Sequence, residues 1–189
     1  MGVASRFASR SVWPVQGAVR RAVLFEPTDM RDRLIIRAES PDQPDVRALL
    51  ADLDSYLASL YPPEANHGLD VEALLAPEVT FYVAREGSQA VGTAAVRRMP
   101  GAADTQGQPY GEIKRMYVDA AYRGREIGIK LLDVIERQLR SEGLSLALLE
   151  TGKDQLQAVR LYERCGYTPR GVFGGYPDNG LSVFYGKAL

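Results

Sequence analysis

The segment that most constrains this chain is a strand that leads through a Gly/Arg loop into a helix. Residues 112–118 form a β-type run, and the loop at residues 123–128 opens an amphipathic pattern that continues to about Arg140. Such a junction leaves unpaired backbone N–H groups at the start of the helix, where they favour a phosphate or pyrophosphate. Glu112 lies upstream on the same strand, where its carboxylate could handle protons. An anion-binding helix start beside an acid/base group predicts an enzyme that uses a phosphate-bearing cofactor.

Length and composition exclude several classes of protein. With 189 residues, the chain is long enough for one domain with a buried core. A net charge of −1 gives no general attraction to nucleic acid or anionic membranes, and no apolar run approaches a membrane span of roughly 20 residues. One cysteine and one histidine can build neither an internal disulfide nor a Cys/His zinc site. We therefore expect a cytoplasmic protein with no metal, no nucleic-acid partner and no membrane partner.

Residues 1–29 differ in composition from the rest of the chain. The first 25 residues hold four arginines, three serines and no acidic residue, which is the composition of an organelle transit peptide. A tail outside the fold, or an upstream start codon used in place of Met30, gives the same pattern, and we favour these interpretations. The prediction is a basic tail over residues 1–29 and one domain over residues 30–189, with organellar import left open.

Hydrophobic periodicity predicts a mixed α/β domain. The expected strands cover residues 34–37, 80–84, 90–96, 112–118, 144–149 and 181–185. The expected helices end near Leu60, cover residues 71–75, run from Gly124 or Arg125 to about Arg140, and cover residues 155–165. A glycine-rich segment at residues 171–180 precedes the last strand, and its Asn179-Gly180 pair is typical of a hairpin turn.

Three sequence blocks in a fixed order carry a family resemblance. The strand of residues 112–118 is followed by Arg123-Gly124-Arg125-Glu126-Ile127-Gly128. A second strand covers residues 144–150, and the next helix reads Gln155-x-x-Ala158-x-x-Leu161-Tyr162-x-x-x-Gly166-Tyr167. The chain from about Leu34 to Leu189 thereby resembles the GNAT superfamily of acyl-CoA-dependent N-acetyltransferases. One short motif is weak evidence, but three on the expected elements are specific. The resemblance implies the GNAT fold, a central, mostly antiparallel twisted sheet of six to seven strands flanked by four helices.

Two residues depart from the family pattern. Glu126 replaces the first glycine of the loop motif, where its carboxylate would repel a pyrophosphate and its side chain would hinder close backbone approach. We prefer a second interpretation, in which Glu126 lies in the first turn of the helix, favours the helix dipole and turns its side chain to solvent. Gln155 replaces the family's asparagine and can still form hydrogen bonds, with a longer reach.

The resemblance implies acetyl-CoA as the co-substrate. It places the backbone N–H groups of residues 125–128 on the pyrophosphate, whereas an ordinary strand-to-helix connection with solvated arginines is the alternative. It also implies that Met116 and Val118 offer backbone groups to the pantetheine arm, with one N–H polarising the thioester carbonyl. The predicted cofactor-binding residues are Met116, Tyr117, Val118, Arg123, Gly124, Arg125, Glu126, Ile127, Gly128, Gln155 and Ala158.

Two residues are the predicted catalytic groups. Alkylamines are mostly protonated at neutral pH, so a partly buried carboxylate such as Glu112 could act as the general base. The resemblance implies that the Tyr162 hydroxyl lies near the CoA sulfur and protonates the departing thiolate. The alternatives are a solvent-facing glutamate at the start of a strand and a tyrosine packed at a helix–sheet seam.

The acceptor side is less specific. The predicted substrate-binding residues are Tyr56, Tyr61, Arg98, Lys114 and Tyr176. The cations around the expected site favour a small primary amine that also carries an anionic group. These cations could equally form a solvated face, and Phe173–Pro177 is either a mobile lid or a plain surface loop. A peptide N-terminal or lysine acetyltransferase and a non-catalytic acyl-CoA-binding regulatory domain stay open as alternatives. The family also makes a homodimer an option.

Overall fold

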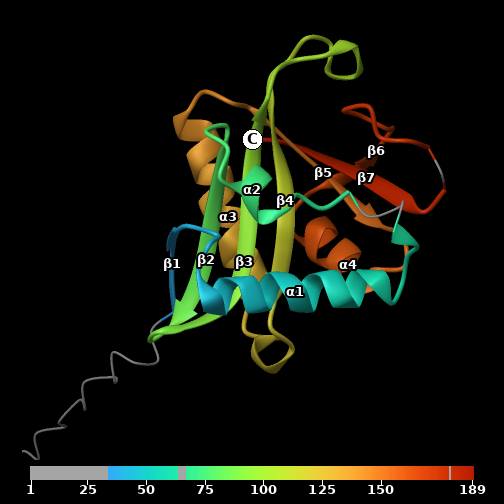
Figure 1. Ribbon diagram of the computed structural model, residues 1–189. Coiled ribbons are helices and arrows are strands. Elements are labelled where there is room, and N and C mark those ends of the chain that lie inside the picture. Colours follow the sequence, from blue (N-terminus) through green and yellow to red (C-terminus); the bar gives the residue numbers. More distant parts are fainter. Residues whose placement is uncertain (1–33, 64–66, 179) are drawn as a thin grey trace, which may run out of the picture.

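The computed structural model describes residues 34–63, 67–178 and 180–189 of the chain (Figure 1). The predicted tail over residues 1–29 and the start of the domain at residue 30 lie outside these residues, as does half of the Asn179-Gly180 turn. Within the described part of the chain, no helix is long and apolar enough to cross a membrane. These same ranges contain no group of three or more His, Cys, Asp or Glu side chains that could hold a metal ion.

The described residues form one seven-stranded sheet with helices on both faces. The strands are β1 (Leu34–Ala38), β2 (Val79–Glu86), β3 (Gln89–Met99), β4 (Tyr110–Val118), β5 (Leu146–Gly152), β6 (Thr168–Arg170) and β7 (Ser182–Ala188). Their order in the sheet is β1-β2-β3-β4-β5-β7-β6. Neighbouring strands are antiparallel except for the parallel pair β4 and β5. The helices are α1 (Pro44–Ala58), α2 (Val71–Leu74), α3 (Ile127–Ser141) and α4 (Leu156–Arg164). The predicted mixed α/β, mostly antiparallel architecture is confirmed.

Alternation along the strands divides the core between the two faces of the sheet. In β2, Phe81 and Val83 pack against buried side chains of α1 and α2, whereas Tyr82 and Ala84 pack against α3. Successive side chains of a strand point to opposite faces, so one apolar run serves two cores. Figure 1 shows α1 crossing one face of the sheet while α3 lies behind the other. The site is therefore built on a sheet that is packed on both sides.

An irregularity in β4 separates it from β5. The register between β3 and β4 shifts between Thr93 and Ala95, and opposite this shift Arg115 has a left-handed φ of 53°. Two residues of β4 thus face one residue of β3, which is a β-bulge. The ladder between β4 and β5 covers only residues 111–113 and 147–149. Beyond Ile113 the two strands no longer pair, and the backbone of β4 is left open on that side.

Several element boundaries differ from the prediction. Helix α3 begins at Ile127 rather than at Gly124 or Arg125, because Gly124 and Glu126 have left-handed φ values of 80° and 61°. Strand β5 continues to Gly152 and thus carries Glu150 past the end of its pairing with β4. The segment after β6 is anchored rather than loose, since the Phe173 side chain is buried in a core cluster. The segment is thus a largely exposed loop that Phe173 fixes to the core, and the lid stays a prediction.

An ion cluster around the buried Arg85 ties β1, β2 and the start of α1 together. The Arg85 guanidinium donates to Glu39 at 3.0 Å and to Asp45 at 2.6 Å. Burial by itself would raise the pKa of Glu39, but hydrogen bonds from Arg85, Arg37 and Gln43 outweigh it and lower the pKa to about 2. A carboxyl group whose pKa is lowered by folding stabilises the fold above its unfolded pKa and loses this contribution as the pH falls.

We therefore expect the Glu39 contribution to disappear between about pH 4.5 and pH 2, with a total of roughly 3 kcal/mol. Urea unfolding of the wild type and Glu39→Gln at a series of pH values measures it. The difference in unfolding free energy should be large at pH 7 and shrink towards pH 2. A difference that does not depend on pH would contradict the assignment.

Candidate active site

Two adjoining cavities lie where β4 and β5 separate. The first, here the strand cavity, has about 690 Å³ of empty space including its open side. The second, here the loop cavity, has about 1150 Å³ on the same measure and extends along the start of α3. Leu53, Met116 and Gln155 line both. A long ligand in the loop cavity would therefore present its end to the strand cavity.

The loop cavity contains nearly all of the predicted cofactor residues. It is lined by Met116, Tyr117, Val118, Arg123, Gly124, Glu126, Ile127, Gly128, Gln155 and Ala158. Of the predicted set, Arg125 does not line it, because its guanidinium pairs with Glu86 at 3.1 Å and lies over the Tyr122 ring. The sequence reasoning missed Tyr122, Ile129, Gln157, Leu161 and Arg164, and it assigned Tyr56 to the acceptor although Tyr56 lines this cavity. Helical spacing from Ala158 would have found Leu161.

The start of α3 offers unpaired donors to the loop cavity. The first backbone bond that closes this helix runs from Lys130 N to Glu126 O at 3.0 Å. The N–H groups of residues 127–129 precede it and have no partner within the helix. Ile127 and Gly128 also line the cavity. This arrangement fits a phosphate group by backbone geometry.

Glu126 precedes the helix and adopts an unfavourable conformation. It is the N-cap residue, with a φ of 61° and no hydrogen bond from its side chain to the helix. The interpretation that placed it in the first turn is thus wrong by one residue, although its side chain is exposed as expected. A left-handed φ favours glycine over a residue with a Cβ. The glycine of the family motif is therefore explained by backbone conformation as well as by space for the ligand.

Tyr162 reaches the strand cavity from α4. Its side chain is only 5% exposed, and its ring packs edge-on against Tyr167. Burial, with a smaller effect from the Glu150 charge, raises the pKa of Tyr162. The hydroxyl therefore keeps its proton at neutral pH. Among the described residues, none forms a hydrogen bond with it, so it is available to a ligand.

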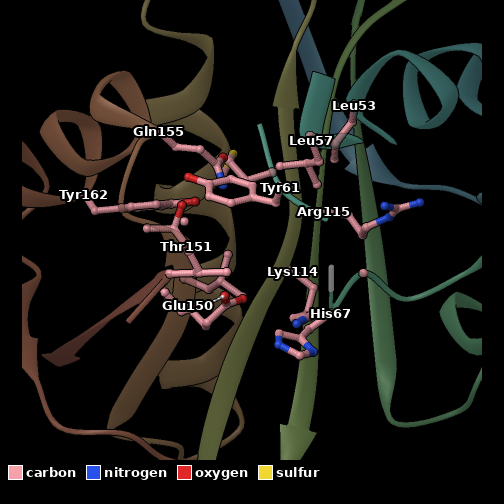
Figure 2. A pocket seen from close by; sticks show the side chains of 16 residues that line it. Leu53, Leu57, Tyr61, His67, Lys114, Arg115, Glu150, Thr151, Gln155 and Tyr162 are labelled. Carbon is pink, nitrogen blue, oxygen red and sulfur yellow. Dashed lines mark hydrogen bonds between the residues drawn. The ribbon is translucent and has the colours of Figure 1, made fainter. Parts of the chain in front are cut away.

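The carboxylate that lines the strand cavity is Glu150, at the end of β5. Figure 2 shows it on the wall that also holds Thr151 and Tyr162, opposite Lys114 and His67. The Ser182 hydroxyl on β7 donates to its Oε1 at 2.5 Å. The sequence reasoning assigned Glu150 no role. Its place directly after the apolar run predicted as a strand over residues 144–149 was the available signal.

Glu112 lines neither cavity. Its side chain is buried, it accepts a hydrogen bond from the Tyr176 hydroxyl, and the Lys114 Nζ lies 3.6 Å from its Oε1. Lys114 in turn donates to the Tyr176 hydroxyl at 2.6 Å, and the His67 ring packs edge-on against Tyr176. Glu112 thus helps to hold Tyr176 and the segment after β6 against the sheet.

The predicted acceptor residues lie in different places. Tyr61 and Lys114 line the strand cavity, and the Tyr61 hydroxyl accepts a hydrogen bond from Asp154 N at 2.8 Å. Tyr176 lies behind Lys114 and does not line the cavity. Arg98 lies away from both cavities, where its guanidinium binds Glu142 at 2.8 Å. The structure therefore does not bring the predicted acceptor set together.

A model of the acetyltransferase (GNAT) family matches residues 45–167, from α1 to the end of α4. This chain belongs to the GNAT acetyltransferase family. It is similar to an IAA acetyltransferase of Azospirillum brasilense, with 46% identity over 154 residues, 82% of this chain and 97% of that protein. Both GNAT membership and enzyme class are thereby confirmed.

Solved structures agree with this assignment. A proposed acyl-CoA N-acyltransferase from Klebsiella pneumoniae subsp. pneumoniae is 32% identical, with a TM-score of 0.65 over 82% of this chain and 97% of that one. The PaiA N-acetyltransferase of Thermoplasma acidophilum, solved with coenzyme A, has a TM-score of 0.61 at 16% identity, over 83% of this chain and 99% of that one. The second likeness concerns the fold alone.

Proposed function

We propose that this GNAT enzyme transfers the acetyl group of acetyl-CoA directly to a primary amine of a small molecule, with Tyr162 as the general acid. The observation that carries the proposal is the joining of the two cavities. The loop cavity has unpaired N–H groups at the start of α3, and it opens towards the strand cavity at Gln155 and Met116. The acyl end of a bound CoA would then meet an acceptor beside Tyr162.

The acceptor side supports a small molecule. The strand cavity joins the apolar side chains of Leu53, Leu57 and Ile113 to a larger set of polar and charged groups, among them Lys114, Glu150 and Tyr162. A concave site with convergent polar groups favours a small polar ligand. For the transferred group, the name of the Azospirillum relative, an IAA acetyltransferase, supports acetyl. The sequence predicts Glu112 as the general base, and this assignment stays a prediction. A homodimer also stays a prediction.

Calorimetric titration with acetyl-CoA, followed by a thiol assay for released CoASH, tests the proposal. The acceptor panel contains 2-phenylethylamine, tyramine, putrescine, glutamate and a short peptide. Binding with turnover on one or more free amines is the expected result. Turnover on the peptide alone would favour the peptide acetyltransferase, and binding without any turnover would favour the regulatory domain.

Glu126→Gly is expected to bind acetyl-CoA more tightly than the wild type. Glycine removes a negative charge and a side chain from the loop cavity, where they would repel a pyrophosphate and hinder its approach to the backbone. The calorimetric Kd should fall roughly fivefold or more. Glu72→Gln on α2 removes a charge elsewhere and serves as the control. An unchanged or weaker affinity of the glycine variant would contradict the prediction.

A further inference from the structure

We propose that Glu150, held by Ser182, binds the ammonium group of the acceptor and removes its proton, which selects a cationic amine without a carboxylate. This inference rests on the proposed function. It replaces the expectation of an anionic acceptor and competes with the prediction that Glu112 is the base. Three features of the strand cavity carry it: the balance of charges, the fixed position of the carboxylate, and its place beside Tyr162.

The cations near the strand cavity are already neutralised by protein carboxylates. Lys114 lies 3.6 Å from Glu112, and the Arg115 guanidinium forms a two-point pair with Asp54. Glu150 differs from these groups, because no described residue forms an ion pair with it. A buried or half-buried charge without a partner is costly. The local charge balance therefore favours a ligand that brings a positive charge.

Glu150 is held in place by β7. The Ser182 hydroxyl donates to Oε1 at 2.5 Å, and β7 pairs with β5 along residues 146–152. With one oxygen held in this way, the carboxylate keeps Oε2 for a ligand. Figure 2 shows the Glu150 side chain directed from β5 into the space between the two walls of the cavity. Ser182 is thus a positioning residue.

Glu112 is poorly placed for the same task. Its Oε1 already accepts the Tyr176 hydroxyl and faces Lys114. The residue does not line the strand cavity, whereas Glu150 and Tyr162 both do. A general base must come within hydrogen-bonding reach of the proton that it takes, directly or through one water. Glu150 meets this requirement for an acceptor in the strand cavity.

The proton balance of the reaction closes with these groups. The Glu150 carboxylate takes one proton from the ammonium, which leaves a neutral amine with a lone pair. The amine nitrogen forms a bond to the thioester carbon, and the carbon–sulfur bond then breaks. Tyr162 gives its proton to the thiolate and regains one as the new amide nitrogen loses its extra proton. Glu150 releases the first proton to solvent, so the net products are an amide, CoASH and one proton.

Other titratable groups surround Glu150 and could share the pH dependence. They come from every element around the cavity, namely Glu112, Lys114 and Arg115 on β4, Tyr61 and His67 between α1 and α2, Tyr162 on α4, and Tyr176 after β6. The tests therefore compare matched Glu→Gln variants rather than one pH profile alone.

The first test measures turnover of acetyl-CoA with the best amine of the panel. Glu150→Gln should lower kcat roughly 10²- to 10⁴-fold at pH 7, and the loss should shrink at high pH, where the free amine needs no base. Ser182→Ala should give a smaller loss in kcat, and Ser182→Thr should restore it. Glu72→Gln is the surface control. Unchanged turnover of Glu150→Gln, or a pH-dependent loss confined to Glu112→Gln, would overturn the inference.

The second test does not depend on turnover. Calorimetry compares 2-phenylethylamine with its neutral isostere 2-phenylethanol, each titrated into protein saturated with CoA. The wild type should prefer the amine, and Glu150→Gln should lose this preference. A wild type that shows no preference would overturn the inference even if acetyl transfer occurs. A preference without turnover would support the ammonium site while the proposed transferase function fails.

Discussion

Tyr162→Phe is expected to lower kcat about 10²- to 10⁴-fold, because it removes the group that protonates the departing thiolate. The Tyr162 hydroxyl lines the strand cavity, and burial raises its pKa so that it stays protonated. Phenylalanine keeps the ring and its edge-on contact with Tyr167. The affinity for acetyl-CoA should therefore change little, and steady-state kinetics together with calorimetry would measure both effects.

Tyr167→Phe is the matched control for this prediction. Tyr167 is a buried neighbour of Tyr162 that does not line the strand cavity. Within residues 34–63, 67–178 and 180–189, no group meets the geometry of a hydrogen bond to its hydroxyl, so removing it should change the stability of the fold little. The control should keep full activity. If Tyr162→Phe kept the wild-type kcat on the true acceptor, Tyr162 would not be the acid.

Gly152→Ala is expected to lower kcat/KM for the acceptor about 10²-fold, because a displacement near 1 Å in a catalytic cavity can cost that much. A Cβ at Gly152 would overlap the Tyr61 ring. Tyr61 is buried and lines the strand cavity, where its hydroxyl is fixed by Asp154 N. The collision would push the ring into the space of the acceptor or shift the end of β5.

Gly171→Ala is the control, since nothing lies within 4 Å of a Cβ at that position. Kinetics with varied acceptor and fixed acetyl-CoA would show the loss in kcat/KM for Gly152→Ala alone. The affinity for acetyl-CoA should remain near the wild-type value, because Gly152 does not line the loop cavity. A wild-type kcat/KM for the acceptor in Gly152→Ala would contradict the prediction, because the Tyr61 ring would then have moved without affecting the acceptor.

Much of the lining of the loop cavity was predictable from the sequence for a local reason. The strand, the loop and the start of α3 follow one another within residues 112–128, so their geometry depends on short-range backbone conformation. Eight of the nine predicted residues within this segment line the loop cavity as a result, and Arg125 is the exception. The prediction for Arg125 was wrong because its guanidinium pairs with Glu86, 39 residues away in the sequence.

The acceptor side was less predictable because it depends on distant pairs. Arg98 was expected to face the acceptor, but it binds Glu142, 44 residues further along the chain. Glu112 is engaged by Tyr176, 64 residues away. Residue type and strand position indicate that a charge is present, but they do not indicate which opposite charge will neutralise it.

By itself, the sequence determined the mixed α/β class and the family, because these depend on periodicity and on motifs within single elements. It also predicted the loop that lines the loop cavity and proposed Tyr162 as the acid. The tertiary structure alone decided which carboxylate lines the cavity. Strand β4 bulges at Arg115 and loses its pairing with β5 beyond Ile113. Glu150 is thereby exposed to the cavity, while the segment after β6 folds back and engages Glu112.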